Sequence, residues 1–424
     1  MKFLLILLLL GTFVVQAQFK NNRLGEGVAY TGRSGPSIAI SRKKPNTIVA
    51  VTITNEVYRT VNEGADWEKA ESGFEPTGIN PQIISDRKGD FYAFYIPKGS
   101  DGKYHQIHCN LSKDGGATWE EKGLAGSDNS TQEIDNPRVF VHPKSGDMFM
   151  TWTEFDRKEG DDKCKGYVVF STSKEGKKWS DPLRMNQQPG NCLNDGRTAQ
   201  GSSAAVSMND LMFVAWSMNQ KIYLDRSFDK GNMWLSNDIQ FQDQPGGWLL
   251  EVPEVSYCTG MPLMVIDNSA SRFNGSLHVV WADRKNGHDD SDIWYTRSVN
   301  FGDNWSNAKR VNDDEPGHHQ FMPSMVIDQA TGHIYILYYD RRNYDNAQTD
   351  VYLSYSIDNG SSFQSIKIND RPIVPGTESN LGFTSIDAYR GIITPIWTAV
   401  ENGKATTCTA VILYDDLAKT TPQN

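Results

Sequence analysis

Two loops of this sequence open with the same pair of residues, an aspartate followed by an arginine. Asp283-Arg284 begins one loop, and Asp340-Arg341-Arg342 begins the other. A planar guanidinium binds the oxygens of a carboxylate or sulfate through two parallel hydrogen bonds, so all three arginines are candidates for holding an anionic substrate. The alternative is structural: each aspartate caps its loop and pairs with the arginine beside it.

Proton transfer or nucleophilic attack beside such arginines needs a carboxyl, an imidazole or an activated hydroxyl. The candidate catalytic residues are Asp283, Asp340, Tyr339, Glu251 and His318. A second histidine follows His318 directly, and adjacent residues of a strand point to opposite sides. We therefore expect one imidazole to act as acid or base and the other to pack, with an ordinary hydrogen-bonding role for both as the alternative.

Two further residues are candidates for substrate binding. Arg33 precedes the first apolar segment, and Trp248 follows a Pro-Gly-Gly turn in a long loop. An amphipathic indole can stack on a sugar ring, but a loop tryptophan can equally pack onto the structure beneath it.

Acidic residues gather in the same two loops as the arginines. One loop holds Asp289, Asp290 and Asp292, and the other holds Asp345 and Asp350. Carboxylate oxygens suit Ca²⁺, but the spacing matches no known calcium loop. We therefore expect no cofactor, with a structural calcium ion as an open alternative.

An eight-residue pattern recurs along the chain and dictates what positions these loops. It has a hydroxyl residue, an acid or amide two residues later, Gly two further on and an aromatic residue three after that. Its copies occupy residues 60–67, 112–119, 227–234, 298–305 and 356–363, with a degenerate copy at 172–179 that has Lys174 in place of the acid. Repetition at roughly 50 to 60 residues is typical of propellers and arrays.

Each repeat also holds short strand-like segments rich in Val, Ile and aromatic residues, without helical periodicity. The sequence therefore predicts an all-β fold, a propeller of four-stranded blades. Three strand-like segments after residue 383 lack a fourth, and residues 27–32 are otherwise unpaired. We predict seven blades, closed by this N-terminal strand, because closure removes the last open sheet edge. Six blades, one for each copy of the pattern, are the alternative.

The pattern resembles the Asp-box, or BNR repeat, of sialidases and many other secreted propellers. The resemblance implies that the repeated turns crowd one face and that a site lies on the opposite face. A sialidase would grip a substrate carboxylate with three arginines, for which Arg33, Arg284 and Arg342 are available. The family's first arginine usually stands in Arg-Ile-Pro, whereas here Ser34 and Gly35 separate Arg33 from the proline.

The resemblance favours a glycoside hydrolase of sialidase type that acts on an acidic sugar. A non-catalytic propeller that binds carbohydrate or protein is the second hypothesis, and a polysaccharide lyase is the third. The net charge of −10, with both signs interspersed, argues against nucleic acid as a partner. The expected partner is therefore a glycan or polysaccharide, bound by a monomer.

Residues 1–17 have one lysine, an apolar run and a small-residue end, which is typical of a secretory signal peptide. We expect residues 18–424 to form one exported propeller domain, periplasmic or extracellular, without membrane insertion. An oxidising compartment permits disulfides. Cys192 and Cys258 are the predicted pair, because both lie in long loops of adjacent repeats; free buried thiols are the alternative.

Overall fold

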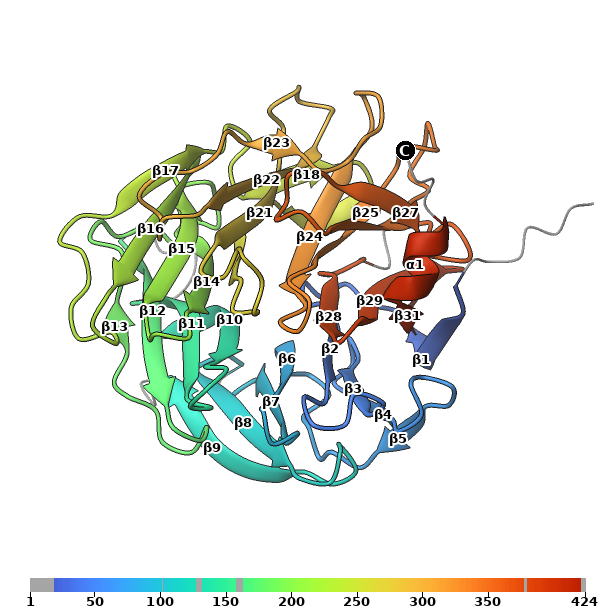
Figure 1. The fold of residues 1–424 in the computed structure, drawn as a ribbon, viewed down its shortest axis with the longest axis horizontal. Helices are drawn as coiled ribbons and strands as arrows, with labels where there is room; N and C mark the ends of the chain where they lie inside the picture. Colours follow the sequence, from blue (N-terminus) through green and yellow to red (C-terminus); the bar gives the residue numbers. More distant parts are fainter. Residues whose placement is uncertain (1–18, 101, 127–131, 158–162, 377–379, 421–424) are drawn as a thin grey trace, which may run out of the picture.

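Seven antiparallel sheets stand around a central axis (Figure 1). The structure is a computed structural model, which describes residues 19–100, 102–126, 132–157, 163–376 and 380–420. The predicted signal peptide, residues 1–17, lies outside these residues. Seven blades are thus confirmed, and the six-bladed alternative is wrong.

Six of the blades take their four strands in chain order. Blade 1 has β2 (Ser37–Ile40), β3 (Ile48–Val51), β4 (Val57–Thr60) and β5 (Glu68–Ala70); blade 2 has β6 (Ile79–Ser85), β7 (Phe91–Ile96), β8 (Gln106–Ser112) and β9 (Glu120–Gly126); blade 3 has β10 (Glu133–Val141), β11 (Met148–Phe155), β12 (Gly166–Ser173) and β13 (Leu183–Arg184). Blade 4 has β14 (Gln200–Val206), β15 (Met212–Met218), β16 (Lys221–Ser227) and β17 (Ile239–Asp243); blade 5 has β20 (Leu263–Ile266), β21 (Leu277–Asp283), β22 (Asp292–Ser298) and β23 (Lys309–Arg310); blade 6 has β24 (Gln320–Ile327), β25 (Ile334–Asp340), β26 (Asp350–Ser356) and β27 (Gln364–Lys367).

Blade 7 joins the two ends of the chain. Its strands are β28 (Ser385–Tyr389), β29 (Ile392–Glu401), β30 (Lys404–Ala410) and the N-terminal β1 (Asn21–Val28), which runs antiparallel to β30. Closure by an N-terminal strand is confirmed, although β1 begins six residues before the predicted start at residue 27. The register is set by Leu24, which is buried in a cluster with core residues of blades 1 and 7.

The chain ends in the short strand β31 (Ile412–Leu413) and the helix α1 (Tyr414–Thr420), which Figure 1 shows at the edge of blade 7. Among the described residues, no helix has the length and apolar character needed to cross a membrane.

The repeated turns join the third and fourth strands of their blades, and their residues bond one another. Ser112 Oγ donates to Asp114 Oδ1 (2.8 Å) and accepts from Gly116 N (2.9 Å), while Trp119 Nε1 donates to the Gly116 carbonyl (3.1 Å). Asp114 Oδ1 also accepts from Thr118 N (3.0 Å). The acid therefore caps the turn, as expected of an Asp-type turn residue.

The degenerate turn of blade 3 differs in length as well as in sequence. Met148 pairs with Ser173, as Phe91 of blade 2 pairs with Ser112, so Ser173 holds the position of the turn hydroxyl. The turn is therefore one residue shorter than the others. Glu175 stands two residues after Ser173, at the place of Asp114, but it does not bond the hydroxyl, and Ser173 Oγ is buried without a hydrogen-bond partner among the described residues.

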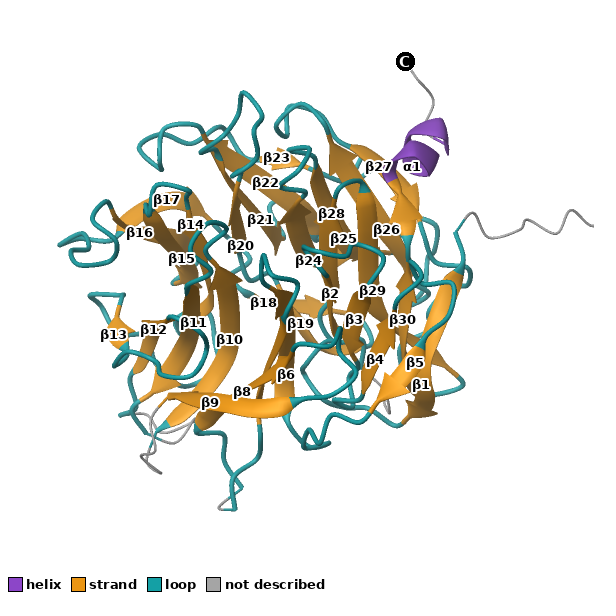
Figure 2. Ribbon diagram, turned by 60° about the horizontal axis from the view of Figure 1, so that its bottom comes forward, coloured by secondary structure: helices purple, strands orange, loops and turns teal. Residues whose placement is uncertain are grey.

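A β-hairpin that belongs to none of the blades is inserted between blades 4 and 5. It consists of β18 (Leu249–Val252) and β19 (Val255–Thr259), joined through Glu254 with a positive φ of 59°. Tyr257 lies under the Arg33 guanidinium, 4.8 Å from the ring centroid, and packs edge-on against Phe383. Arg33 precedes β2 of blade 1, and Phe383 precedes β28 of blade 7. Both blades lie across the ring from blades 4 and 5, so the hairpin spans the central opening (Figure 2).

The disulfide joins Cys164 to Cys192, so the predicted pairing of Cys192 with Cys258 is wrong. Cys164 lies in the loop between β11 and β12, and its Cα atom is 5.5 Å from that of Cys192, within bonding range. Cys258 is instead turned into the core beneath the hairpin, where it is a free thiol like Cys109 and Cys408. The alternative of buried free thiols therefore holds for these three cysteines.

Candidate functional site

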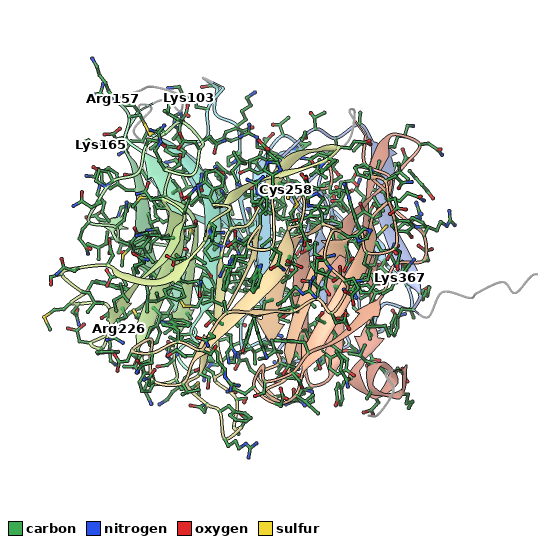
Figure 3. The ribbon with its side chains drawn as sticks, turned by 90° about the horizontal axis from the view of Figure 1, so that it is seen from above. Lys103, Arg157, Lys165, Arg226, Cys258 and Lys367 are labelled. Atoms are coloured by element: carbon green, nitrogen blue, oxygen red, sulfur yellow. A yellow bond between two sulfur atoms is a disulfide. The ribbon has the colours of Figure 1, made fainter. Side chains whose placement is uncertain are left out.

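The two faces of the ring carry different structures. Figure 3 shows Cys258 of the hairpin on the same side as Arg157 and Lys165, which flank the loop between β11 and β12, and Arg226 lies towards the other side. Arg226 directly precedes the repeated turn of blade 4. The hairpin and the loops between second and third strands thus share the face opposite the Asp-box turns, where the topology predicted a site.

On this face, four segments of blades 5 and 6 meet beneath the hairpin. Arg284 follows β21, and Ser291 ends the same loop. Ser291 accepts a backbone hydrogen bond from Gln320 N and lies 3.0 Å from Nδ1 of His319. The backbone N–H of Arg341 donates to the His319 carbonyl (3.0 Å). One backbone bond between blades 5 and 6 and one within blade 6 therefore hold His319 and Arg341 together. Arg284 lies near enough for its charge to act on His319, and we call Arg284, His319 and Arg341 the arginine–histidine cluster.

The two arginines of the cluster have hydrogen-bonding groups to spare. Arg341 is 4% exposed; its Nε donates to Thr349 Oγ1 (3.1 Å), while its buried Nη2 has no acceptor among the described residues. Nη1 of Arg284 is likewise buried without an acceptor, and the nearest acid, Glu251 on the hairpin, is 3.9 Å away. Buried polar groups are nearly always bonded, so these two N–H groups are unusual.

The cluster keeps His319 neutral. Burial lowers the pKa of His319 to about 4, and the positive charges of Arg341 and Arg284 add to the effect. Burial also raises the pKa of the neighbouring Cys258 thiol, which is therefore protonated at neutral pH. With two guanidinium groups and a neutral imidazole, the cluster is suited to holding an anion and poorly suited to holding a metal cation.

The aspartates of the two Asp-Arg pairs stabilise their own loops. Asp283 Oδ1 accepts from the backbone N–H of Gly246 (2.7 Å) and of Arg284 (2.8 Å). Asp340 is fully buried and binds Arg342 through Nε and Nη2, both at 2.8 Å. Both residues thus act as caps; Asp340 is committed to Arg342, whereas Oδ2 of Asp283 is buried without a hydrogen-bond partner among the described residues.

Arg342 is saturated by acids and is not available to a substrate. Besides Asp340, it binds Asp313 (2.6 Å) and lies 3.7 Å from Asp314. These carboxylates raise the pKa of the Arg342 guanidinium. Asp340 therefore pairs with Arg342, and not with Arg341 as the structural alternative expected, whereas the side chains of Arg284 and Arg341 are near acids of the hairpin.

Two of the predicted site residues belong to the core. Tyr339 is fully buried, and its hydroxyl bonds to the Leu381 carbonyl and to the backbone of Thr398, which leaves no free hydroxyl for nucleophilic attack. Trp248 is fully buried, with Nε1 bonded to the Thr198 carbonyl (2.9 Å), so it cannot stack on a sugar. Both predictions are wrong because each side chain is fully buried: Tyr339 bonds to blade 7, and Trp248 bonds to the segment that leads into blade 4.

The remaining candidates lie at the periphery of the cluster or outside it. Glu251 is 80% exposed and stands between Arg284 and His288. His318 lies 3.7 Å from Asp345 and points away from the position that His319 occupies. Arg33 packs on Tyr257 and does not join Arg284 or Arg342. The three arginines expected to grip one carboxylate therefore have three separate sets of partners.

Asp135, in the entry to blade 3, is a further buried acid on this face. Its two oxygens accept hydrogen bonds from Asn80 Nδ2, Asn136 N, Asn136 Nδ2 and Gln200 Nε2, at 2.8 to 3.1 Å. Burial raises the pKa of Asp135, and these donors oppose the rise. Because four bonds use its lone pairs, Asp135 ties blades 2, 3 and 4 together and is not a free proton donor.

Two of the acids that suggested calcium, Asp292 and Asp350, are bound by several groups of the protein itself. Asp292 accepts from Asn312, Asn286 and Arg310, and Asp350 accepts from Lys367 and Asn343 among others. Among the described residues, no group of three or more His, Cys, Asp or Glu side chains could hold a metal ion.

Sequence reasoning identified both arginines of the cluster but missed His319 and Cys258. The histidine pair gave the signal for one of them without showing which imidazole is buried. Cys258 could not have been placed, because the hairpin that carries it is an irregular insertion without a counterpart in the other repeats.

Comparisons with known proteins agree on the fold. A family model described as a BNR repeat-like domain matches residues 81–236. Among solved structures, the NanB sialidase of Streptococcus pneumoniae is similar at 10% identity and a TM-score of 0.52, covering 80% of this chain and 68% of its own. No curated protein sequence matches the chain.

Two other structures are similar over more of the chain. The α-L-arabinofuranosidase Arb93A of Fusarium graminearum has 12% identity and a TM-score of 0.52, with coverage of 95% and 100%. A polysaccharide lyase, an ulvan lyase, has 12% identity and a TM-score of 0.53, with coverage of 94% and 100%. One architecture therefore serves hydrolases and a lyase in these relatives, and at such identities the likeness extends to the fold alone.

Proposed function

We propose that this seven-bladed propeller, of which residues 81–236 match a BNR repeat-like domain, is an exported protein that recognises an acidic glycan at the arginine–histidine cluster. The observation that carries this proposal is the pair of buried N–H groups, one each on Arg284 and Arg341, that lack an acceptor. They come from equivalent positions of adjacent blades and face the same hairpin. A carboxylate or sulfate of a sugar would supply the missing acceptors.

The hairpin is the expected gate of this site. Glu251 stands 3.9 Å from Arg284, and the charge of Glu254 acts on Arg341. Two hairpin acids therefore occupy the surroundings in which a substrate anion would be most stable. Binding of the glycan would replace these weak contacts with direct, bidentate ones and displace the hairpin outwards.

Hydrolysis of sialidase type is the reaction expected from the family resemblance. It requires arginines that converge on one carboxylate and a nucleophile beside them, and the separate partners of Arg33, Arg284 and Arg342 do not favour that arrangement. Elimination from a uronic acid needs an arginine to neutralise the carboxylate and a neutral base, which His319 with its lowered pKa resembles. Recognition is therefore the part of the function that the geometry supports best, with hydrolysis and elimination as its two catalytic alternatives.

The test is binding of the mature chain to sialosides and to uronic-acid polysaccharides, measured by calorimetry. Arg284→Gln and Arg341→Gln should each weaken binding about tenfold or more, because each removes a charge-assisted hydrogen-bonding group. Arg197→Gln is the matched control, since Arg197 is an exposed arginine of a loop on the same face. Equal binding by all three variants would refute the site.

The same incubations separate the catalytic alternatives. Release of reducing ends without new ultraviolet absorbance indicates hydrolysis, and absorbance of unsaturated uronates indicates elimination. Binding without either product indicates a recognition module.

Export belongs to the same proposal. The leader-like sequence supports it, and a disulfide between Cys164 and Cys192 fits an oxidising compartment. Fractionation of cells that express the full chain tests it: a mature N-terminus at Gln18 outside the cytoplasm is expected, and an uncleaved cytoplasmic chain would contradict it.

A further inference from the structure

The innermost strands of the seven blades enclose a channel of about 520 Å³. That volume lies within the range of pockets that bind small molecules. The charged residues among the described residues that line the channel are Arg42, Arg87, Arg138, His142 and Asp387. Three arginines and one acid face this space in a protein whose net charge is −10, so the channel is positive in a negative molecule.

The upper part of the channel contains a repeated contact between neighbouring blades. The residue after the first proline or serine of an inner strand accepts a hydrogen bond from a backbone N–H of the next blade. The observed cases are Ser37 Oγ with Ile83 N (3.0 Å), Gln82 Oε1 with Val139 N (2.8 Å) and Ser203 Oγ with Met264 N (3.0 Å). These bonds stabilise the ring at its inner wall.

The contact is seen in blades 1, 2 and 4. Arg138 holds this position in blade 3 and Leu263 holds it in blade 5, and neither side chain can accept a hydrogen bond. A guanidinium has no acceptor atom, so it cannot receive the N–H of Ala204 as the equivalent Ser37, Gln82 and Ser203 would. Its own N–H groups have no hydrogen-bond or ion-pair partner among the described residues. Burial within the channel lowers the pKa of Arg138 to about 10, which shows that the charged group is held at a cost.

The channel is covered at one end and charged at the other. On the face of the hairpin, Tyr257 packs against Phe383, one of the residues that line the upper end. At the lower end, on the Asp-box face, Arg87 is exposed on the loop between β6 and β7. Arg42 is there too, bound to Asp387 at 2.7 Å. An anion would therefore be drawn in from the Asp-box face.

We propose that this channel is a second ligand site, which takes a small organic carboxylate with its carboxylate on Arg138 and its apolar part against the channel wall. The partly buried apolar residues that line the channel include Ile84, Val265 and Val326, which suit an aliphatic chain. The planar guanidinium provides two parallel N–H groups for the carboxylate. The site is distinct from the arginine–histidine cluster, which lies outside the channel in blades 5 and 6.

Hexanoate is a probe of the right charge and shape, and hexan-1-ol is its neutral counterpart. Calorimetry on the mature protein should show saturable binding of hexanoate at one site and at least about tenfold weaker binding of hexan-1-ol. Absence of saturable binding of hexanoate would overturn the proposal, as would equal binding of the alcohol.

Arg138→Gln is the decisive variant, because Gln82 shows that glutamine fits the equivalent position and bonds to the next blade. The variant should fold, with an unchanged or raised melting temperature, and should bind hexanoate about tenfold or more weakly. Unchanged affinity would refute the role of Arg138. Binding of acidic glycans by this variant should equal that of the wild type, so failure of the channel site and failure of the glycan site can be told apart.

Chemical modification provides an independent measurement. Phenylglyoxal should modify Arg138, and peptide mass spectrometry identifies the modified residue. Hexanoate at 50-fold its dissociation constant should slow the modification of Arg138 by roughly that factor. Arg197, which is exposed on the face of the hairpin, is the internal control and should be modified equally with and without hexanoate. Loss of protection at Arg138 would contradict the proposal.

Discussion

The two faces of the propeller differ in how they satisfy their turn-forming and charged groups, although Ser173 Oγ, Trp67 Nε1 and Trp305 Nε1 of the Asp-box turns are also buried without partners among the described residues. On the Asp-box face, the turn hydroxyls Thr60, Ser112, Ser227, Ser298 and Ser356 each bond the acid or amide of their own turn and accept the N–H of its glycine. On the opposite face, Arg284 Nη1, Arg341 Nη2 and Asp290 Oδ1 are buried without partners.

This difference separates residues that specify the fold from residues that are available for function. A turn that satisfies its own hydrogen bonds can be copied from blade to blade, because it needs nothing from its neighbours. A buried donor without an acceptor destabilises the fold by about 1 to 3 kcal/mol, so its persistence points to a ligand. Arg138 is half-buried and lines the channel, at a position that makes an inter-blade contact in blades 1, 2 and 4.

The largest effect is expected from a change within a self-satisfied turn. Gly360 of the blade 6 turn has φ of +71°, and a Cβ atom added there would overlap the hydroxyl of Tyr295 in blade 5. Gly360→Ala should lower the free energy of unfolding by about 2 to 4 kcal/mol, from backbone strain and overpacking together. Urea denaturation measures this loss.

Gly146→Ala is the matched control for this change. Gly146 has a similar φ of +80°, but an added Cβ would meet no atom within 4 Å. Its substitution should cost only the strain of the backbone, about 1 kcal/mol. Equal losses for the two variants would show that packing between the turn and the next blade contributes nothing.

A smaller effect is expected on the opposite face, from the protonation of His319. Its pKa is about 4 in the folded protein and about 6.5 in an unfolded chain. As the pH falls below about 6.5, the His319 imidazole binds a proton in the unfolded state but stays neutral in the folded state. The free energy of unfolding therefore decreases progressively down to about pH 4. The wild type should lose about 1 to 2 kcal/mol more than His319→Gln between pH 7 and pH 4, after allowance for solvent screening.

Denaturation curves at both pH values for wild type and variant give this difference directly. His288→Gln removes an exposed imidazole from the loop that packs beside His319. It should reduce the pH dependence much less than His319→Gln, because the charge of His288 contributes less to the pKa of His319 than burial and the neighbouring arginines do. If His319→Gln retains the full pH dependence, His319 is not held neutral by its surroundings.

The same contrast explains what the sequence could predict. The turns recur at a regular period and bond internally, so their count and spacing were enough for the all-β propeller, and the three unpaired segments after residue 383 revealed the seventh blade. Arg284 and Arg341 were found because two blades share the Asp-Arg pair. The burial of Trp248 and Tyr339, and the pairing of Cys164 with Cys192, depend on contacts between blades and on an inserted hairpin, and neither follows any repeat.

The smallest effect is expected from a substitution that another copy of the turn already carries, asparagine in place of aspartate. Asp114 Oδ1 accepts from Ser112 Oγ, Ala117 N and Thr118 N, and the amide oxygen of Asn300 makes the corresponding bonds in blade 5. Asp114→Asn keeps this oxygen, so we expect unfolding to change by less than about 0.5 kcal/mol and glycan binding not to change at all. Asp114→Ala removes the acceptor and should cost about 1 to 2 kcal/mol. A loss of glycan binding in Asp114→Asn at unchanged stability would contradict the division of labour between the faces, because it would require the charge of a turn acid to act across the ring.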